Sequence, residues 1–250
     1  MKNLAEEVIK AVQEFWRALP KGRASRASGS RGKHLQGFTK LCRRILIDAG
    51  LTETELFWTG DTELPGFYRA ERSWSLIAVA DGELVVAIEV QAQIGRDVRS
   101  NFNGRIEEVV GSATDLWAAY EANVFPQSQR PWLGYLLLLE DCSESTKPVK
   151  VRKPHFPVLP EFKRASYAKR SEQLLLRLVQ GGLYNAASLI FAHQSNASIG
   201  LHTSPRPELE FEHFVSSLTA HVRGFVQRRA ERAPNTSRKS TSRKSRKKRP

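Results

Sequence analysis

The amino-acid sequence predicts an α/β domain with a mixed central sheet that is flanked by helices. Two apolar runs, SWSLIAVA and ELVVAIEVQ, flank Asp81-Gly82, and this pattern predicts a β-hairpin over residues 73–91. A third apolar run, WLGYLLLLED at residues 132–141, is too apolar for an edge strand. Apolar residues at helical spacing before, between and after these runs complete the pattern of a sheet between helices.

Two helices are predicted before the hairpin. Apolar side chains recur at helical spacing through residues 3–19. A second apolar stripe runs from Leu35 to Leu46, and Gly50 is placed to end that helix as a C-cap. Cys42 lies within this second stripe, so we expect its side chain in the core.

The second half of the chain is predicted to be mainly helical. A long helix is expected to begin near Asn103 and to reach Tyr120, ahead of the third strand. Residues 142–165 are interpreted as a proline-rich connection. Residues 167–192 and residues 205–225 carry the last predicted helices.

The positive charge is concentrated in two segments of the chain, whose net charge is +13. Residues 235–250 contain eight Lys or Arg and no acidic residue, and residues 21–34 contain five and no acidic residue. Such segments attract polyanions by releasing counterions, without sequence preference. A solvated tail that only aids solubility is the alternative. We expect one domain over residues 1–233 and a disordered basic tail over residues 234–250.

Several protein classes are disfavoured by composition. The longest apolar runs, such as residues 136–139, are too short to span a bilayer, and the N-terminal MKNLAEEVIK has no apolar signal-peptide core. Two cysteines, Cys42 and Cys142, argue against a disulfide framework and for a reducing compartment. The sequence therefore favours a globular protein of a reducing compartment.

The second strand of the hairpin carries an unexpected charge. In VVAIEVQAQIG, residues 85–95, Glu89 interrupts an apolar run, and Gln91 follows on the same face of the strand. A buried carboxylate without compensation costs several kcal/mol, as a rough figure, so an arginine partner, a raised pKa or a metal ion is expected. Two oxygen donors on one strand suit a hard cation such as Mg²⁺, and an exposed or salt-bridged glutamate is the alternative.

A resemblance extends over most of the chain, from about Gly32 to about Val222. The segments that carry it are RSWSLIAVADGELVVAIEVQAQIG, NFNGRIEEVVGSATDLWAAY, RPWLGYLLLLED, PHF at 154–156, SYAKR at 166–170 and PELEFEHFVSSLTAHV. Together they resemble the XhoI-type family of type II restriction endonucleases. The segment from Asn101 to Tyr120 is the most specific part, and the chain after Pro234 falls outside the pattern.

The resemblance implies a fold, an activity and partners. It implies the restriction-endonuclease-like PD-(D/E)xK fold, with magnesium held by an Asp on one strand and by the Glu of a Glu-x-Lys on the next. It implies cleavage of double-stranded DNA at the palindrome CTCGAG by a homodimer whose symmetry matches that of the site. A restriction role also implies a cognate DNA methyltransferase and a bacterial cytoplasm.

The chain departs from the family pattern at positions that the pattern gives as catalytic. Ser75 follows Trp74 where the family has Trp-Asp, and Gln91 stands where the family has the lysine of Glu-x-Lys. Ala92 replaces the usual Ser, so only Glu89 remains of the three main catalytic positions. The candidate catalytic residues are thus Glu89, Gln91 and Ser75, with Glu89 as the metal ligand. We expect Ser75→Asp combined with Gln91→Lys to restore or raise cleavage.

The hairpin register provides a geometric test of this site. A two-residue Asp81-Gly82 loop pairs Ser75 with Ile88 and places Ser75 and Glu89 on opposite faces. A three-residue loop places both side chains on one face. If the site exists, the hairpin should therefore contain an odd-numbered loop or a bulge.

Base contacts are expected just after the second hairpin strand. Asn101, Asn103 and Arg105 precede or open the long helix, and these residue types read adenine and guanine edges. Alternatively the asparagines cap the helix and Arg105 pairs with Glu107 or Glu108. The two glutamates could also approach the site, although a favourable interaction with the helix N-terminus is the preferred interpretation.

Three functions are compatible with these observations. The first is a working Mg²⁺-dependent endonuclease with a remodelled site. The second is a catalytically impaired relative that still binds DNA, because Ser75 and Gln91 replace the family Asp and Lys. The third is a general nucleic-acid-binding protein that depends on its basic segments.

Overall fold

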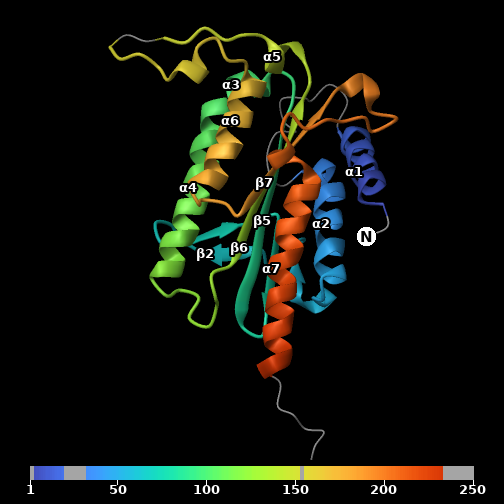
Figure 1. Cartoon of the computed structure of the whole chain (residues 1–250), viewed down its shortest axis with the longest axis vertical. Helices are drawn as coiled ribbons and strands as arrows, with labels where there is room; N and C mark the ends of the chain where they lie inside the picture. Colours follow the sequence, from blue (N-terminus) through green and yellow to red (C-terminus); the bar gives the residue numbers. More distant parts are fainter. Residues whose placement is uncertain (1–2, 20–31, 153–154, 233–250) are drawn as a thin grey trace, which may run out of the picture.

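The computed structural model describes residues 3–19, 32–152 and 155–232. The predicted basic tail and all but the last residues of the basic segment 21–34 lie outside this range. A five-stranded sheet with the order β1-β4-β5-β6-β7 forms the centre of the molecule (Figure 1). Its strands are β1 (Leu56–Phe57), β4 (Leu76–Ala80), β5 (Glu83–Gln93), β6 (Trp132–Glu140) and β7 (Ala186–Ala192).

The sheet is mixed, as predicted. β4 runs antiparallel to β1 and β5, whereas β5, β6 and β7 are parallel to one another. β6 lies between β5 and β7 and is buried along nearly its whole length, which confirms that it is not an edge strand. A separate two-stranded sheet pairs β2 (Glu63–Pro65) with β3 (Glu71–Ser73).

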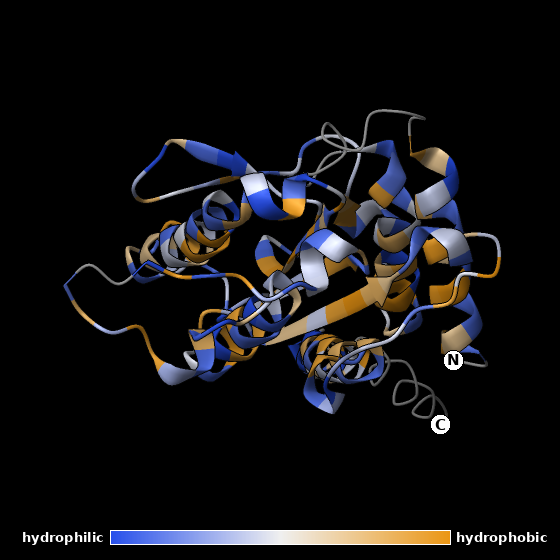
Figure 2. Cartoon of the chain, turned by 90° about the horizontal axis from the view of Figure 1, so that it is seen from above, coloured by the Kyte–Doolittle hydropathy of each residue, from blue (hydrophilic) through white to orange (hydrophobic). Residues whose placement is uncertain are grey.

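Helices cover both faces of the sheet and bury two apolar clusters against it (Figure 1). One face is covered by α1 (Leu4–Ala18), α2 (Gln36–Asp48) and α7 (Phe211–Arg232). The other face is covered by α4 (Phe102–Glu121) and α6 (Tyr167–Gln180). In Figure 2 hydrophobic residues concentrate on the strands and on the helix surfaces turned towards them. The α/β fold class with a helix-flanked mixed sheet is therefore confirmed.

The remaining elements are short and lie in the connections. They are the α-helices α3 (Asp97–Ser100) and α5 (Ser143–Thr146) and the 3-10 helices η2 (Lys33–Leu35), η3 (Glu53–Glu55), η4 (Pro160–Phe162), η5 (Gln194–Asn196) and η6 (Pro207–Leu209). Of the helices in the described part of the chain, none combines the length and the apolar character needed to cross a bilayer.

The prediction of continuous helix over residues 167–192 was wrong in its second half. α6 ends at Gln180, and residues 186–192 form β7, which pairs in parallel with β6. Gly182 adopts a left-handed φ of +70° just after the helix, a conformation that favours glycine and stops helical propagation. The run AASLIFA is apolar on both sides, so its periodicity alone could not distinguish a strand from a helix.

The hairpin contains the predicted bulge. Its loop is the two-residue Asp81-Gly82, with φ of +53° and +79°. The register shifts between Ala78 and Val79, so that Ala78 pairs with Val86 but Val79 pairs with Leu84. Beyond the bulge, Leu76 pairs with Ile88, and the register brings the start of β4 level with Glu89.

Candidate nuclease site

Glu89 lies in the middle of β5, a strand that is buried on both faces because neighbouring strands and helices enclose it. Its side chain is 1% exposed. Arg72 of β3 reaches it from the two-stranded sheet, with Nη1 3.0 Å from Oε2 of Glu89. Burial raises the pKa of Glu89 above its ordinary value, and the guanidinium of Arg72 opposes that rise. An arginine partner thus compensates the buried carboxylate.

Arg72 also connects Glu89 to the long helix. Its Nη2 lies 3.8 Å from Oε1 of Glu108 on α4, and the other carboxylate oxygen of Glu108 accepts a hydrogen bond from Arg105 at 2.6 Å. The Arg72 guanidinium is also stacked over the Trp74 ring, 4.5 Å from its centroid. β3, β5 and α4 are therefore held together by a chain of alternating charges.

Gln91 is a full participant in this network. Its Nε2 donates to Oε1 of Glu89 at 3.3 Å, and its Oε1 accepts a hydrogen bond from the Tyr135 hydroxyl at 2.8 Å. Tyr135 stands on β6 opposite Glu89, and burial raises the pKa of its hydroxyl. Glu89 and Gln91 are brought together as the alternation of a strand predicts.

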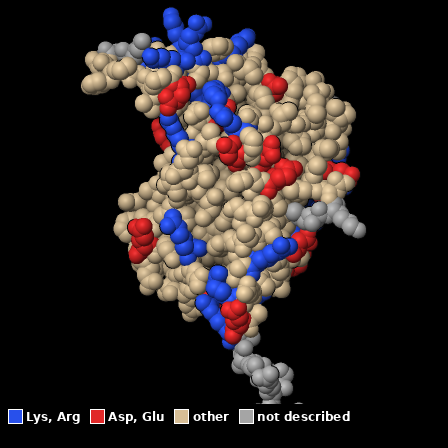
Figure 3. Space-filling model, in the orientation of Figure 1, with Lys and Arg blue, Asp and Glu red and all other residues tan. Residues whose placement is uncertain are grey.

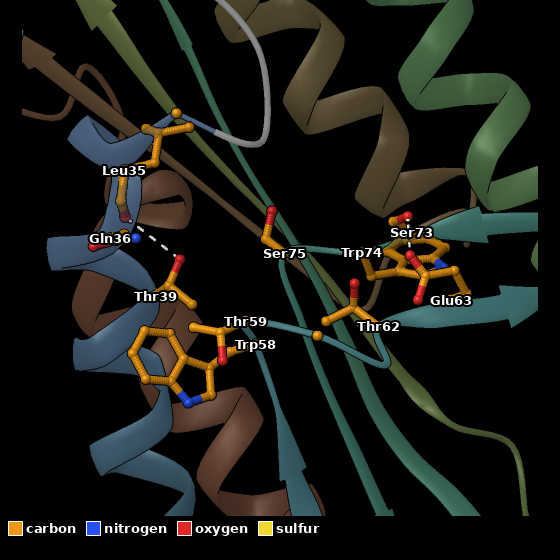
Figure 4. A pocket seen from close by; sticks show the side chains of 12 residues that line it. Leu35, Gln36, Thr39, Trp58, Thr59, Thr62, Glu63, Ser73, Trp74 and Ser75 are labelled. Carbon is orange, nitrogen blue, oxygen red and sulfur yellow. Dashed lines mark hydrogen bonds between the residues drawn. The ribbon is translucent and has the colours of Figure 1, made fainter.

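Ser75 lies next to the same strand but makes a different contact. Its hydroxyl oxygen accepts a hydrogen bond from the backbone N–H of Val90 at 2.9 Å. The side chain lines a cavity of about 340 Å³ together with residues of α2 and of the segment Trp58–Glu63 (Figure 4). β4 begins only at Leu76, so the strict alternation of a strand does not extend to Ser75.

The predicted DNA-reading residues gather at the start of α4. Asn101 directly precedes the helix, partly buried and without a side-chain cap hydrogen bond, and Asn103 is exposed in the first turn. Arg105 makes the alternative ion pair with Glu108. Asn103 is therefore the most accessible of the three for a base contact.

A basic cavity lies beside these residues. It has a volume of about 570 Å³ between α3, α5 and α6, and its described lining includes the basic residues Arg99, Lys147 and Lys150 and the acidic residue Glu144. Arg99 stands two positions before Asn101, so the cavity adjoins the start of α4. In Figure 3, Lys and Arg side chains gather at the top of the view, over the segment that leads from α5 towards α6.

A comparison with known protein families matches residues 21–204 to the family described as "Restriction endonuclease XhoI". The chain belongs to the XhoI restriction endonuclease family. The family match covers most of the sequence, including β5, α4, β6 and β7, and confirms the resemblance found in the sequence.

Three curated relatives illustrate the similarity. The type II restriction enzyme BstVI of Geobacillus stearothermophilus is 38% identical over 207 residues, which cover 81% of this chain and 92% of that protein. The type II restriction enzyme XhoI of Xanthomonas vasicola is 36% identical over 153 residues, 60% of this chain and 62% of that protein. The type II restriction enzyme AbrI of Azospirillum brasilense is 39% identical over 127 residues, 50% and 57% respectively. No solved structure matches this chain.

The residues at the XhoI-family site do not fit a Mg²⁺ ion in the arrangement they adopt. Both carboxylate oxygens of Glu89 are engaged, one by Arg72 and the other by Gln91. Within residues 3–19, 32–152 and 155–232, no group of three or more His, Cys, Asp or Glu side chains could hold a metal ion. Hard divalent cations need several oxygen ligands that face open space, and Glu89 offers none.

Sequence reasoning missed two residues of this network, Arg72 and Tyr135, and left Glu108 with an open role. Arg72 belongs to a three-residue strand with no periodicity, so nothing local marked it as a partner of Glu89. Tyr135 is the hydroxyl-bearing residue of the apolar β6 run, and a hydroxyl in such a run was an available signal of a buried polar contact.

Proposed function

We propose that this chain is a DNA-binding member of the XhoI restriction endonuclease family in which the cleavage step is impaired. By resemblance, its ligand is double-stranded DNA with the palindrome CTCGAG. The observation that carries the proposal is the state of Glu89, the one catalytic carboxylate of the family pattern that is retained. Arg72 and Gln91 occupy its two oxygens.

The other two positions of the family pattern support the same conclusion. Metal-assisted hydrolysis of a phosphodiester needs carboxylates that hold the ion, because the ion must activate water and stabilise developing charge. Ser75 has a neutral hydroxyl, and that hydroxyl is hydrogen-bonded to the Val90 backbone. Gln91 carries no positive charge, and its amide bridges Glu89 and Tyr135.

A second candidate is Mg²⁺-dependent cleavage of CTCGAG through a rearranged site. Its support is the 38% identity to a protein named a type II restriction enzyme, over 92% of that protein's length. For this function Glu89 would have to be released from Arg72. A cognate methyltransferase would then be needed to protect the host's own sites.

The basic cavity is the proposed place for the DNA backbone. Arg99, Lys147 and Lys150 line it, and phosphate contacts of such residues position a protein on DNA without reading its sequence. Asn101 and Asn103 lie alongside and would face base edges. A homodimer would place two such surfaces on the two halves of a palindrome.

The test is a gel-shift and cleavage assay on the purified full chain. Duplexes that contain CTCGAG or a scrambled hexamer are compared with and without Mg²⁺, over a range of salt concentrations. A shift that is specific for CTCGAG and leaves the DNA intact is the expected result. Specific cuts that Glu89→Gln abolishes would support the second candidate instead.

One further outcome would overturn the proposal, and another would overturn its placement of the DNA backbone. Binding that ignores the sequence and falls steeply with salt would leave only a general nucleic-acid-binding protein. Unchanged affinity after Lys147→Ala combined with Lys150→Ala would remove the basic cavity from the interface, because each lost phosphate contact lowers both the affinity and its salt dependence.

A further inference from the structure

One guanidinium at the candidate site contacts carboxylates from two different elements. Arg72 places Nη1 3.0 Å from Glu89 on β5 and Nη2 3.8 Å from Glu108 on α4. The Arg72 side chain is only 11% exposed. A buried positive charge between two carboxylates is the electrostatic role that a divalent ion has in a metalloenzyme.

We propose that Arg72 is the built-in cation of this site: it excludes divalent ions from Glu89 and Glu108, and its removal creates a divalent-cation site. The inference deepens the proposed function and rests on it, because it gives a physical reason why a family member retains the carboxylate without the metal chemistry.

The charge balance at the site is the first argument. Glu89 and Glu108 carry two negative charges, and Arg72 and Arg105 carry two positive charges, so the four groups are neutral together. A divalent ion added to this arrangement would leave a buried excess of positive charge, which is strongly unfavourable. An arginine side chain stays protonated across the pH range in which proteins are usually folded, so a change of pH cannot remove the positive charge of Arg72.

The loss of Arg72 changes this balance. Glu89 would then be a buried carboxylate with only the Gln91 amide as a partner, and such a group must take up a proton or a cation. Glu108 would face the same space, because Arg72 is the group between the two side chains. Two carboxylates that face the same space are oxygen ligands that suit Mg²⁺ or Mn²⁺.

A consequence concerns the repair of the family pattern. Ser75→Asp with Gln91→Lys was expected from the sequence to restore cleavage. Arg72 would still occupy Oε2 of Glu89, and Gln91→Lys would replace the amide donor at Oε1 with an ammonium group that adds a further positive charge. The double variant should therefore bind no divalent ion unless Arg72 is removed as well.

The experiment measures metal binding without DNA. Mn²⁺ is titrated calorimetrically into the wild-type chain and into Arg72→Met, and Tb³⁺ luminescence sensitised by the adjacent Trp74 reports the location of the ion. We expect Mn²⁺ to bind Arg72→Met at least about tenfold more tightly than the wild type, a difference of about 1.4 kcal/mol. Adding Glu89→Gln to Arg72→Met should abolish the gain.

Arg69→Met is the matched control. Arg69 stands on the same two-stranded hairpin and also pairs with a buried acid, Asp115, at 3.0 Å. That acid accepts two backbone N–H bonds from Phe67 and Tyr68, so it is compensated without the arginine. Arg69→Met should therefore gain no affinity for Mn²⁺.

Four results would overturn the inference. Three concern binding: Tb³⁺ binding to the wild-type chain that depends on Glu89, a folded Arg72→Met that binds no more Mn²⁺ than the wild type, and an equal gain in Arg69→Met. The fourth concerns folding. If Arg72→Met folds only when Mn²⁺ is present, the inference is supported. If it fails to fold with or without Mn²⁺ while Arg72→Met with Glu89→Gln folds, Arg72 is a structural partner only and the inference fails. None of these results depends on DNA binding by the wild type, so the proposed function stands or falls separately.

Discussion

Two arginines of the β2–β3 hairpin pair with buried carboxylates, and the two pairs differ in what the carboxylate would have without its arginine. Asp115 accepts hydrogen bonds from the backbone of Phe67 and Tyr68 in addition to its contact with Arg69. Among the described residues, the side-chain partners of Glu89 are Arg72 and the amide of Gln91. The Arg69 side chain is 46% exposed, whereas that of Arg72 is 11% exposed.

The two pairs therefore have different roles: Asp115 with Arg69 is a structural anchor of the hairpin, and Glu89 with Arg72 belongs to the candidate site. The Asp115 carboxylate holds the hairpin turn through fixed backbone donors, and Arg69 adds a contact that water screens. The Glu89 carboxylate depends for its charge compensation on one side chain that reaches it from another sheet. A group whose compensation can be exchanged is suited to chemistry or to its suppression, whereas a group satisfied by the backbone is suited to structure.

The largest expected effect is the loss of stability in Arg72→Met. Removing one partner of a buried ion pair leaves the other unpaired, and this costs about 3–5 kcal/mol. Urea unfolding at neutral pH without divalent ions would measure it. The double variant Arg72→Met with Glu89→Gln should recover most of the loss, because it leaves no buried charge; a double variant as unstable as the single one would contradict the pairing.

A smaller effect is expected in the pH dependence of stability. The pKa of Glu89 is raised in the folded state because burial disfavours its charge. Because its pKa is raised, Glu89 binds more protons in the folded state than in the unfolded state. Its contribution to stability is therefore fully present below pH 4.5 and is lost as the pH rises through the folded-state pKa. Relative to the wild type, Glu89→Gln should therefore gain stability as the pH rises across this window.

Glu172 provides the opposite case for the same measurement. Burial alone would raise its pKa, but hydrogen bonds from Lys169 and Arg206 lower it overall. The contribution of Glu172 to stability is present above pH 4.5 and is lost as the pH falls through the lowered folded-state pKa. Relative to the wild type, Glu172→Gln should therefore lose stability as the pH rises. Equal pH profiles for the two variants would show that the burial of Glu89 has no electrostatic consequence.

The smallest effect is expected for Arg69→Met. A half-exposed arginine in an ion pair contributes less than about 1 kcal/mol, since solvent screens the charge and the backbone already satisfies Asp115. Urea unfolding of this variant beside Arg72→Met would quantify the contrast between the two pairs. A loss of stability as large as that of Arg72→Met would mean that Asp115 depends on Arg69 as strongly as Glu89 depends on Arg72.

Local patterns predicted much of this molecule because they depend on neighbours in the chain. The alternation of a strand placed Glu89 and Gln91 side by side, and the apolar run at 132–141 predicted the central strand. The need to place Ser75 and Glu89 on one face predicted an odd-numbered loop or a bulge, and the hairpin contains a bulge. The run at 186–192 was missed, since an apolar segment buried on both sides has no periodicity that marks a strand.

The sequence by itself determined the family, the order of the main elements as far as β6 and the presence of a lone carboxylate on a buried strand, because all three depend on residue types and short spacings. Only the tertiary structure decided which side chain compensates the charge of that carboxylate. Arg72 is separated from Glu89 by 17 positions and belongs to a different sheet, and the two meet only because the β2–β3 hairpin lies beside the middle of β5. The partner of a buried charge is chosen by packing in three dimensions, and no local pattern encodes it.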